Sequence, residues 1–358
     1  MEAFSLTNRK YLGSKRLLAP CILDAILREA GLPELLLDGF AGTGSVAAEA
    51  LARGARRVVA VDNLASNTAI LRGFACSSGA DGPSKAVGRR IEELNALDGV
   101  EGYVTRSFAG TYFTAENCRR MDSARERIEL WLAAGDIDAG EHAELLAGFL
   151  LGADRVANTV GQYDAFLKHL GSAPMRGGRH LVDGRVYTPF RVLPLAPLPD
   201  GILDVLTGDV VALAPGIHAD VAYLDPPYNS RQYCDCYHVL ENLARWEKPA
   251  LAGKTRKFAR DGLKSSFSSR RTVRDAFSAL LDAVRAPHVY VSYSSEGLLE
   301  PGEVEALMRG RGAVTMHRFP YPVFGSGAGV ARRREVTEYL YHLERTTRDG
   351  SGTRRRST

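Results

Sequence analysis

Four consecutive residues, Asp225-Pro226-Pro227-Tyr228, combine the groups needed to activate an amino nitrogen. Proline lacks a backbone N–H and has a fixed φ, so this turn presents rigid carbonyl acceptors beside the carboxylate of Asp225. An amino group on a heteroaromatic ring is a poor nucleophile because its lone pair is delocalised. Binding both of its protons, one by Asp225 and one by the Pro226 carbonyl, favours a pyramidal nitrogen that can attack. Tyr228 adds a face on which an extruded base can stack. The alternative is a Pro-Pro turn packed by a tyrosine.

A glycine-rich stretch, Asp38-Gly-Phe-Ala-Gly-Thr-Gly44, lies between a short apolar run and a helical pattern. A strand, a tight turn and a helix bring backbone N–H groups to a ligand, and Gly42 and Gly44 allow its close approach. Asp62 ends the next apolar run, where a carboxylate can accept hydrogen bonds from ribose hydroxyls. The pattern predicts a nucleoside-binding site. One alternative is a nicotinamide dehydrogenase, in which the Asp225 turn would have no role. Two others are that the glycine turn is purely structural and that Asp62 caps a helix.

The elements around these motifs alternate between helix and strand. Apolar residues recur at helical spacing over 21–30 and 46–53, and an apolar run at 35–37 precedes the glycine turn. Further apolar runs, typical of buried strands, lie at 58–61, 202–206, 221–224, 288–293 and 338–342. The pattern predicts an α/β fold with a mainly parallel sheet.

Residues 76–199 interrupt this alternation with helical patterns around 115–151, followed by a loop-rich stretch with several prolines. We predict that they form an inserted target-recognition module, and that 1–75 together with 200–345 form the catalytic domain. Residues 346–358 combine glycine, serine and threonine with adjacent arginines, a composition that cannot build a core. We predict that this basic tail is disordered.

Together the motifs resemble those of the Dam-like family of adenine-specific DNA methyltransferases, in which the cofactor turn precedes the recognition region. The stretches that carry the resemblance are 10–15, 38–44, 61–63, 208–209 and 225–228. The resemblance implies a Rossmann-like sheet that binds S-adenosylmethionine, with an inserted, largely helical and loop-rich recognition module. It implies that Asp225 and Tyr228 carry the methylation chemistry. For the cofactor site, the resemblance implies Tyr11, Lys15, Asp38, Phe40, Gly42, Asp62 and Asp209. The glycine-rich turn itself adds Gly44 to this set.

Basic residues are concentrated in 248–274, where they are interleaved with phenylalanines and serines. Such a loop beside the Asp225 turn suits contacts with DNA phosphates, which position a duplex without reading its sequence. The residues predicted to make these contacts are Arg256, Lys257, Lys264, Arg270 and Arg271. Candidates for contacts with base edges in the inserted module are Arg176, Arg179, His180 and Arg185. The alternative for 248–274 is a solvated charged loop.

The composition is that of an ordinary globular protein, with 358 residues, 45% hydrophobic and 25% charged, and a net charge of +4. The five cysteines are scattered and never spaced C-x-x-C, which argues against a disulfide framework or a zinc site, so we expect no metal. The N-terminus has no signal-peptide pattern, and no apolar stretch reaches about 18 residues. We therefore expect a cytoplasmic protein with no membrane partner.

The predicted function is site-specific transfer of a methyl group from S-adenosylmethionine to the exocyclic amino group of adenine in double-stranded DNA. Residues 229–238 and 158–168 look like those of restriction-associated family members. We therefore expect a restriction–modification system with a cognate endonuclease that acts on the same site. Two alternatives stay open: a methyltransferase that acts on RNA or on the cytosine amino group, and a catalytically silent DNA-binding subunit.

Overall fold

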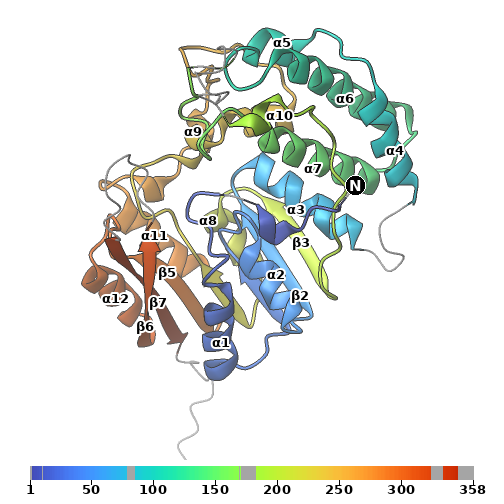
Figure 1. Ribbon diagram of the computed structural model, residues 1–358. Coiled ribbons are helices and arrows are strands. Elements are labelled where there is room, and N and C mark those ends of the chain that lie inside the picture. The colour runs from blue at the N-terminus through green and yellow to red at the C-terminus, as the bar shows by residue number, and fades with distance from the viewer. Residues whose placement is uncertain are drawn as a thin grey trace, which may run out of the picture.

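The computed structural model describes residues 2–9, 11–78, 85–168, 170, 183–323 and 334–345. The sequence singled out four residues that lie outside these ranges, Lys10, Arg176, Arg179 and His180, and the tail 346–358 lies outside them too. The architecture is a central sheet with helices on both faces, and a further layer of helices packs against one of the flanking helices (Figure 1).

The sheet has the strand order β3-β2-β1-β4-β5-β7-β6 in the described residues. The parallel strands are β1 (Leu35–Asp38), β2 (Arg57–Asp62), β3 (Ile202–Thr207), β4 (Val221–Leu224) and β5 (His288–Ser294). β7 (Arg334–Arg345) is antiparallel to β5 and to β6 (Gly312–Val323). The strand order reverses between β1 and β4, the position where open α/β sheets bind ligands outside the carboxyl ends of their strands.

The strands predicted from apolar runs are confirmed as β1, β2, β3, β4, β5 and β7, although β7 is longer than its run. β6 was not predicted. It contains Pro320 and Pro322, which cannot donate ladder hydrogen bonds, and it lies at the edge of the sheet, where proline is tolerated. Its only strand neighbour in the described residues is β7.

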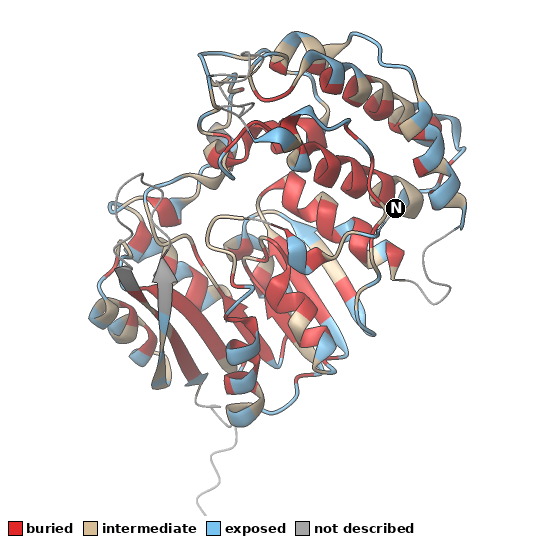
Figure 2. Cartoon of the chain, viewed as in Figure 1, coloured by how far each residue is buried: buried red, intermediate tan, exposed pale blue. Residues whose placement is uncertain are grey.

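Alternate residues of the strands enter two separate hydrophobic cores, one on each face of the sheet. On one face Leu36 packs with α1 (Ala19–Glu29), α2 (Ser45–Ala52) and α3 (Ala65–Ser77). On the other face Leu37 packs with three further helices, α8 (Val210–Leu213), α11 (Val273–Ala283) and α12 (Pro301–Arg309). Figure 2 shows the sheet buried between these layers. The apolar runs of β1, β2, β4 and β5 therefore have no exposed face, as buried parallel strands require, whereas β3 at the sheet edge leaves Ile202 and Leu206 exposed.

A layer of helices from the middle of the chain packs on α3. It contains α4 (Lys85–Ala96), α5 (Tyr103–Phe108), α6 (Ala115–Ala134) and α7 (Ala139–Arg155), so the helical patterns predicted at 115–151 are confirmed. α7 crosses α3 so closely that a Cβ on Gly73 would lie 2.3 Å from the Cβ of Ala147. The layer is thus packed directly against the helix that follows Asp62.

Two helices from much later in the chain, α9 (Tyr233–Cys236) and α10 (His238–Arg245), join this layer (Figure 1). The buried guanidinium of Arg125 on α6 donates to the carbonyls of Leu243 and Ala244, at 3.0 and 3.2 Å. The helical layer therefore includes residues from outside 76–199, and the domain boundaries given above stay a prediction. No helix in the described residues is long and apolar enough to cross a membrane.

Candidate active site

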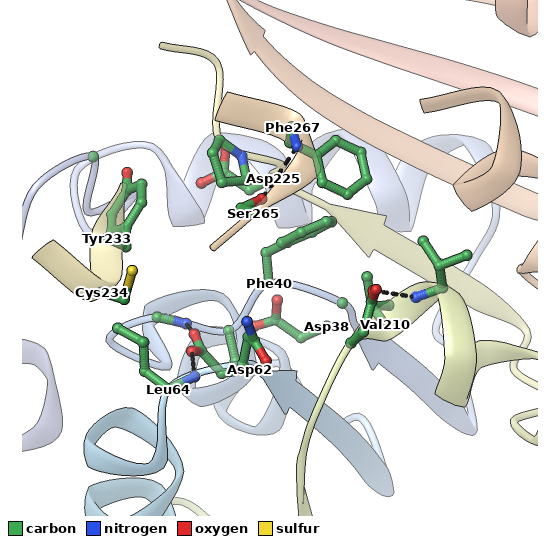
Figure 3. Close-up of a pocket in the computed structure, with 18 of the residues that line it drawn as sticks. Asp38, Phe40, Asp62, Leu64, Val210, Asp225, Tyr233, Cys234, Ser265 and Phe267 are labelled. Carbon is green, nitrogen blue, oxygen red and sulfur yellow. Dashed lines mark hydrogen bonds between the residues drawn. The ribbon is translucent and has the colours of Figure 1, made fainter. Parts of the chain in front are cut away.

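A cavity of about 520 Å³ lies at the carboxyl ends of β1, β2 and β4, where the strand order reverses. This volume falls within the range of small-molecule sites, about 300–1,000 Å³. Figure 3 shows side chains from several elements pointing into the cavity. The predicted residues that line it are Tyr11, Lys15, Asp38, Phe40, Gly42, Asp62, Asp209, Asp225 and Lys264. The fold thus brings the N-terminal motif, the glycine turn and the Asp225 turn to one place.

The two glycines of the turn after β1 have different surroundings. Both have positive φ, +51° at Gly42 and +75° at Gly44, a region that favours glycine. Gly42 lines the cavity, and its N–H donates to Asp62 Oδ2 at 2.8 Å. Gly44 lies outside the lining, and a Cβ there would be 2.4 Å from Leu71 Cδ2. Gly44 therefore allows α2 and α3 to pack closely, and its predicted cofactor contact remains untested.

The carboxylate of Asp62 is largely engaged by the protein itself. Oδ1 accepts from Leu64 N at 2.8 Å, and Oδ2 accepts from Gly42 N at 2.8 Å and from Asn67 Nδ2 at 3.1 Å. A carboxylate has about four acceptor positions, so one is left for a ligand hydroxyl. The helix-capping alternative is wrong, because α3 begins at Ala65 and its first N–H groups donate to Glu241 of α10.

Asp38, at the end of β1, is the most deeply buried acid in the cavity wall, with 1% of its surface exposed. The backbone N–H groups of Phe40 and Ala47 approach its carboxylate, but neither makes a hydrogen bond of good geometry. Burial, with the nearby charges of Asp225 and Asp62, raises the pKa of Asp38 to about 8. A cationic ligand group beside it would therefore be strongly favoured.

An ion pair joins the Asp225 turn to Lys15, near the N-terminus of the chain. Lys15 Nζ lies 2.8 Å from Asp225 Oδ1, and Lys15 is 7% exposed. Burial raises the pKa of Asp225, and the charge of Lys15 opposes that rise. Burial alone would lower the pKa of Lys15, but the charges of Asp225 and Glu338 raise it. Lys15 is therefore a cation that leaves Asp225 Oδ2 available to a substrate.

Tyr228 is half-buried beside this pair. Lys15 Nζ lies 5.8 Å from the centroid of its ring, within cation–π range. The ring meets Tyr293 edge to face at 6.4 Å, and the Tyr228 carbonyl accepts from Leu298 N at 2.8 Å. The backbone and ring are thus fixed, and part of the ring surface is left for a ligand.

Two residues that support this site were not predicted from the sequence. Glu338, on β7, is 7% exposed and electrostatically coupled to Lys15 and Asp225, and burial raises its pKa. A glutamate inside an apolar strand was the signal that could have identified it. Arg9 was also missed: it is 5% exposed and donates to Asn67 Oδ1 at 2.6 Å and to the Gly42 carbonyl at 3.0 Å.

The basic segment 248–274 folds against the cavity. Ser265 and Gln232 exchange two hydrogen bonds, of 2.7 and 3.1 Å, and residues 263–267 complete the cavity wall. Lys257 lies 3.4 Å from Asp235, so part of its charge is compensated within the protein. The other predicted phosphate contacts, Arg256, Lys264, Arg270 and Arg271, have exposed side chains. Lys264 lines the cavity, and Arg270 and Arg271 come directly before Thr272 in its wall.

Arg185, predicted to contact base edges, donates to the Thr159 carbonyl at 3.0 Å and lies 3.4 Å from Asp183. Its guanidinium is therefore engaged with the protein in this structure. Among the described residues, no group of three or more histidine, cysteine, aspartate or glutamate side chains is arranged to bind a metal ion.

Comparison with known proteins identifies relatives of nearly the whole chain. The family model described as D12 class N6 adenine-specific DNA methyltransferase matches residues 198–307, and one described as conserved hypothetical protein 95 matches 24–95. The chain is 30% identical over 351 residues to the type II methyltransferase M.NlaIII of Neisseria lactamica, covering 94% of this chain and 99% of that protein.

Two further relatives are a modification methylase and a second type II methyltransferase. The modification methylase StsI of Streptococcus sanguinis is 28% identical over 351 residues, covering 94% of this chain and 52% of that protein. The type II methyltransferase M.CviAII of Paramecium bursaria Chlorella virus 1 is 30% identical over 347 residues, covering 93% of this chain and 97% of that protein. The chain thus spans about half the length of StsI and nearly all of the other two.

Proposed function

The chain belongs to the D12 class of N6 adenine-specific DNA methyltransferases, and we propose that it methylates adenine N6 at a specific sequence of double-stranded DNA, with S-adenosylmethionine as donor. The observation that carries the proposal is the position of Asp225. This acceptor for an amino group lies in the wall of the same cavity as the glycine turn, 2.8 Å from a buried lysine.

The cavity residues fit S-adenosylmethionine. Asp38 has two buried carboxylate oxygens without a hydrogen-bond partner, which suit the ammonium or sulfonium of the cofactor. Asp62 keeps an acceptor position for a ribose hydroxyl, and Phe40 supplies apolar surface. Asp209 lines the cavity next to these residues, and its Oδ1 accepts from Val211 N at 2.9 Å. When bound, the cofactor supplies an electrophilic methyl group.

The protein's own part in the reaction is to bind and orient the adenine amino group. Asp225 Oδ2 and the Pro226 carbonyl accept its two protons, which favours a pyramidal nitrogen with an available lone pair. The charge of Lys15, 2.8 Å away, opposes the rise that burial causes in the pKa of Asp225 and so favours the ionised carboxylate, the form that only accepts hydrogen bonds. Tyr228 stacks on the extruded base, which an enzyme needs because the amino group cannot be reached inside a duplex.

We propose that DNA phosphates contact the exposed residues Lys264, Arg270 and Arg271, which lie in or next in sequence to the cavity wall, and the exposed Arg256 of the same basic segment. Their side chains are exposed and therefore accessible to DNA phosphates. The relatives named above are modification enzymes, and on that basis we propose a restriction–modification system with a cognate endonuclease for the same site. A cytoplasmic location, together with the DNA substrate, is part of this proposal.

The test is to incubate the full chain with unmethylated bacterial DNA and labelled S-adenosylmethionine, then digest the DNA and identify the labelled nucleoside. We expect the unchanged protein to yield labelled N6-methyl-2′-deoxyadenosine. The variant Asp225→Ala should lose turnover by about 100-fold or more while it still binds the cofactor. Asp204→Ala, on β3 outside the cavity lining, is the matched control and should methylate normally.

Each other outcome would revise a different part of the proposal. Label in cytosine would keep the Asp225 chemistry and change the base. Cofactor binding without any labelled DNA would favour an RNA substrate or a silent DNA-binding subunit. Near-normal turnover of Asp225→Ala would refute the proposed mechanism.

A further inference from the structure

The loop Asn158–Tyr163, which follows α7, is anchored at both ends. Asn158 N donates to the Tyr112 carbonyl at 2.8 Å, and its Nδ2 donates to two further backbone carbonyls at 2.8 Å each. Tyr163 N donates to the Cys236 carbonyl at 2.7 Å, and Tyr163 is fully buried. These contacts attach the loop to the helical layer on one side and to α9 on the other.

The apex of this loop has a defined shape and carries an exposed valine. Gly161 has φ +101° and donates to Thr159 Oγ1 at 3.2 Å, and the Thr159 carbonyl accepts from Arg185 at 3.0 Å. Val160, between these two residues, is 80% exposed, the largest exposed fraction among the large apolar side chains that the structure describes. The valine therefore projects into solvent from a fixed backbone.

This apex lies close to the Asp225 turn. Gln162 Oε1 accepts from the exposed Arg231 at 2.6 Å. Arg231 follows Tyr228 by three residues, so their Cα atoms are at most ~11 Å apart. The other anchor, Cys236, is in α9, and the same helix contributes Tyr233 and Cys234 to the cavity wall. The apex is therefore attached to the segment between the Asp225 turn and α9, which borders the cavity that an extruded adenine would enter.

Extruding an adenine breaks its stacking and leaves a gap in the duplex, which proteins that distort DNA fill with apolar side chains. We infer that Val160 enters the base stack at the target site and occupies the space of the extruded adenine, with Gln162 and Arg231 contacting the DNA beside it. This inference rests on the proposed function and adds a DNA-contacting residue to it. A β-branched side chain suits the role, because its χ1 is stiff and little rotamer freedom is lost on insertion.

The recognition site is first mapped in DNA that the unchanged protein has methylated. The test then compares Val160→Ala with the unchanged protein on two duplexes that contain this site. In one duplex the target adenine is paired, and in the other it faces an abasic position, which lowers the cost of extrusion. We expect kcat/KM of the variant to fall about 10-fold or more on the paired duplex and to stay within about 2-fold on the other. Val100→Ala, at another exposed valine (63%), is the matched control.

A second measurement reports extrusion directly. With 2-aminopurine at the target position, the unchanged protein should raise its fluorescence in the paired duplex, and Val160→Ala should raise it much less. The inference would be overturned if Val160→Ala had the same kcat/KM as the unchanged protein on both duplexes. It would also be overturned if the variant lost the same factor in kcat/KM on both. If the unchanged protein methylates neither duplex, the proposed function fails as well, so the two failures are distinguishable.

Discussion

Replacing Asp38 by asparagine removes a buried charge while nearly preserving the size of the side chain. The carboxylate is 1% exposed, and burial together with the charges of Asp225 and Asp62 raises its pKa from 3.8 to about 8. Because the folded-state pKa lies above the unfolded one, the folded state binds more protons in this window. The contribution of Asp38 to stability is therefore fully present below about pH 4 and is lost as the pH rises to about 8.

The magnitude follows from the two pKa values. Each pH unit between them costs the wild-type protein about 1.4 kcal/mol. Relative to wild type, Asp38→Asn should therefore gain about 2.5 kcal/mol in unfolding free energy when the pH is raised from about 5.5 to 7.5. Only this change between the two pH values is predicted, because the amide also alters hydrogen bonding in the cavity by an amount that does not depend on pH.

The assay is urea unfolding of the cofactor-free protein at both pH values, with Asp98→Asn as the control at an exposed aspartate. The control should differ from wild type equally at the two pH values. A constant difference between Asp38→Asn and wild type would refute the argument, because it would mean that Asp38 does not titrate in this window.

Three further changes test packing, the join between layers, and the DNA surface. Gly44→Ala places a Cβ 2.4 Å from Leu71 Cδ2 at a positive φ, so urea unfolding should show a loss of about 2–3 kcal/mol; wild-type stability would contradict this. Glu241→Gln weakens the buried acceptor of the first α3 N–H groups and should cost about 1–3 kcal/mol, with faster amide exchange at the start of α3; unchanged exchange would argue against it. Arg270→Ala should reduce the slope of log K against log salt for DNA by about 1, measured by fluorescence anisotropy, whereas Arg309→Ala on α12 should leave it unchanged; equal slopes would remove Arg270 from the DNA surface.

Much of the sheet could be predicted because its central strands are buried on both faces and appear as short apolar runs. β4 is the clearest example, since all four of its residues are buried and Asp225 follows directly. β6 could not be predicted, because prolines disfavour a strand and only its place at the sheet edge tolerates them. α9 and α10 follow the Asp225 turn in the chain, but contacts of α10 with α3 and α7 place α10 in the helical layer, and α9 packs on α10.

The sequence by itself determined the local chemistry: glycines where φ is positive, two prolines that expose a carbonyl, and acids at the ends of apolar runs. These are properties of single residues and their neighbours in the chain, so they can be recognised without a fold. Only the tertiary structure decided which charges meet. Lys15 lies against Asp225, and Glu338 interacts electrostatically with both. The reasons are that β7 pairs with β5, the neighbour of β4, and that the N-terminal segment lines the same cavity as Asp225. The same holds for the loop of Val160, which hydrogen bonds join to Arg231 and Cys236, far away in sequence.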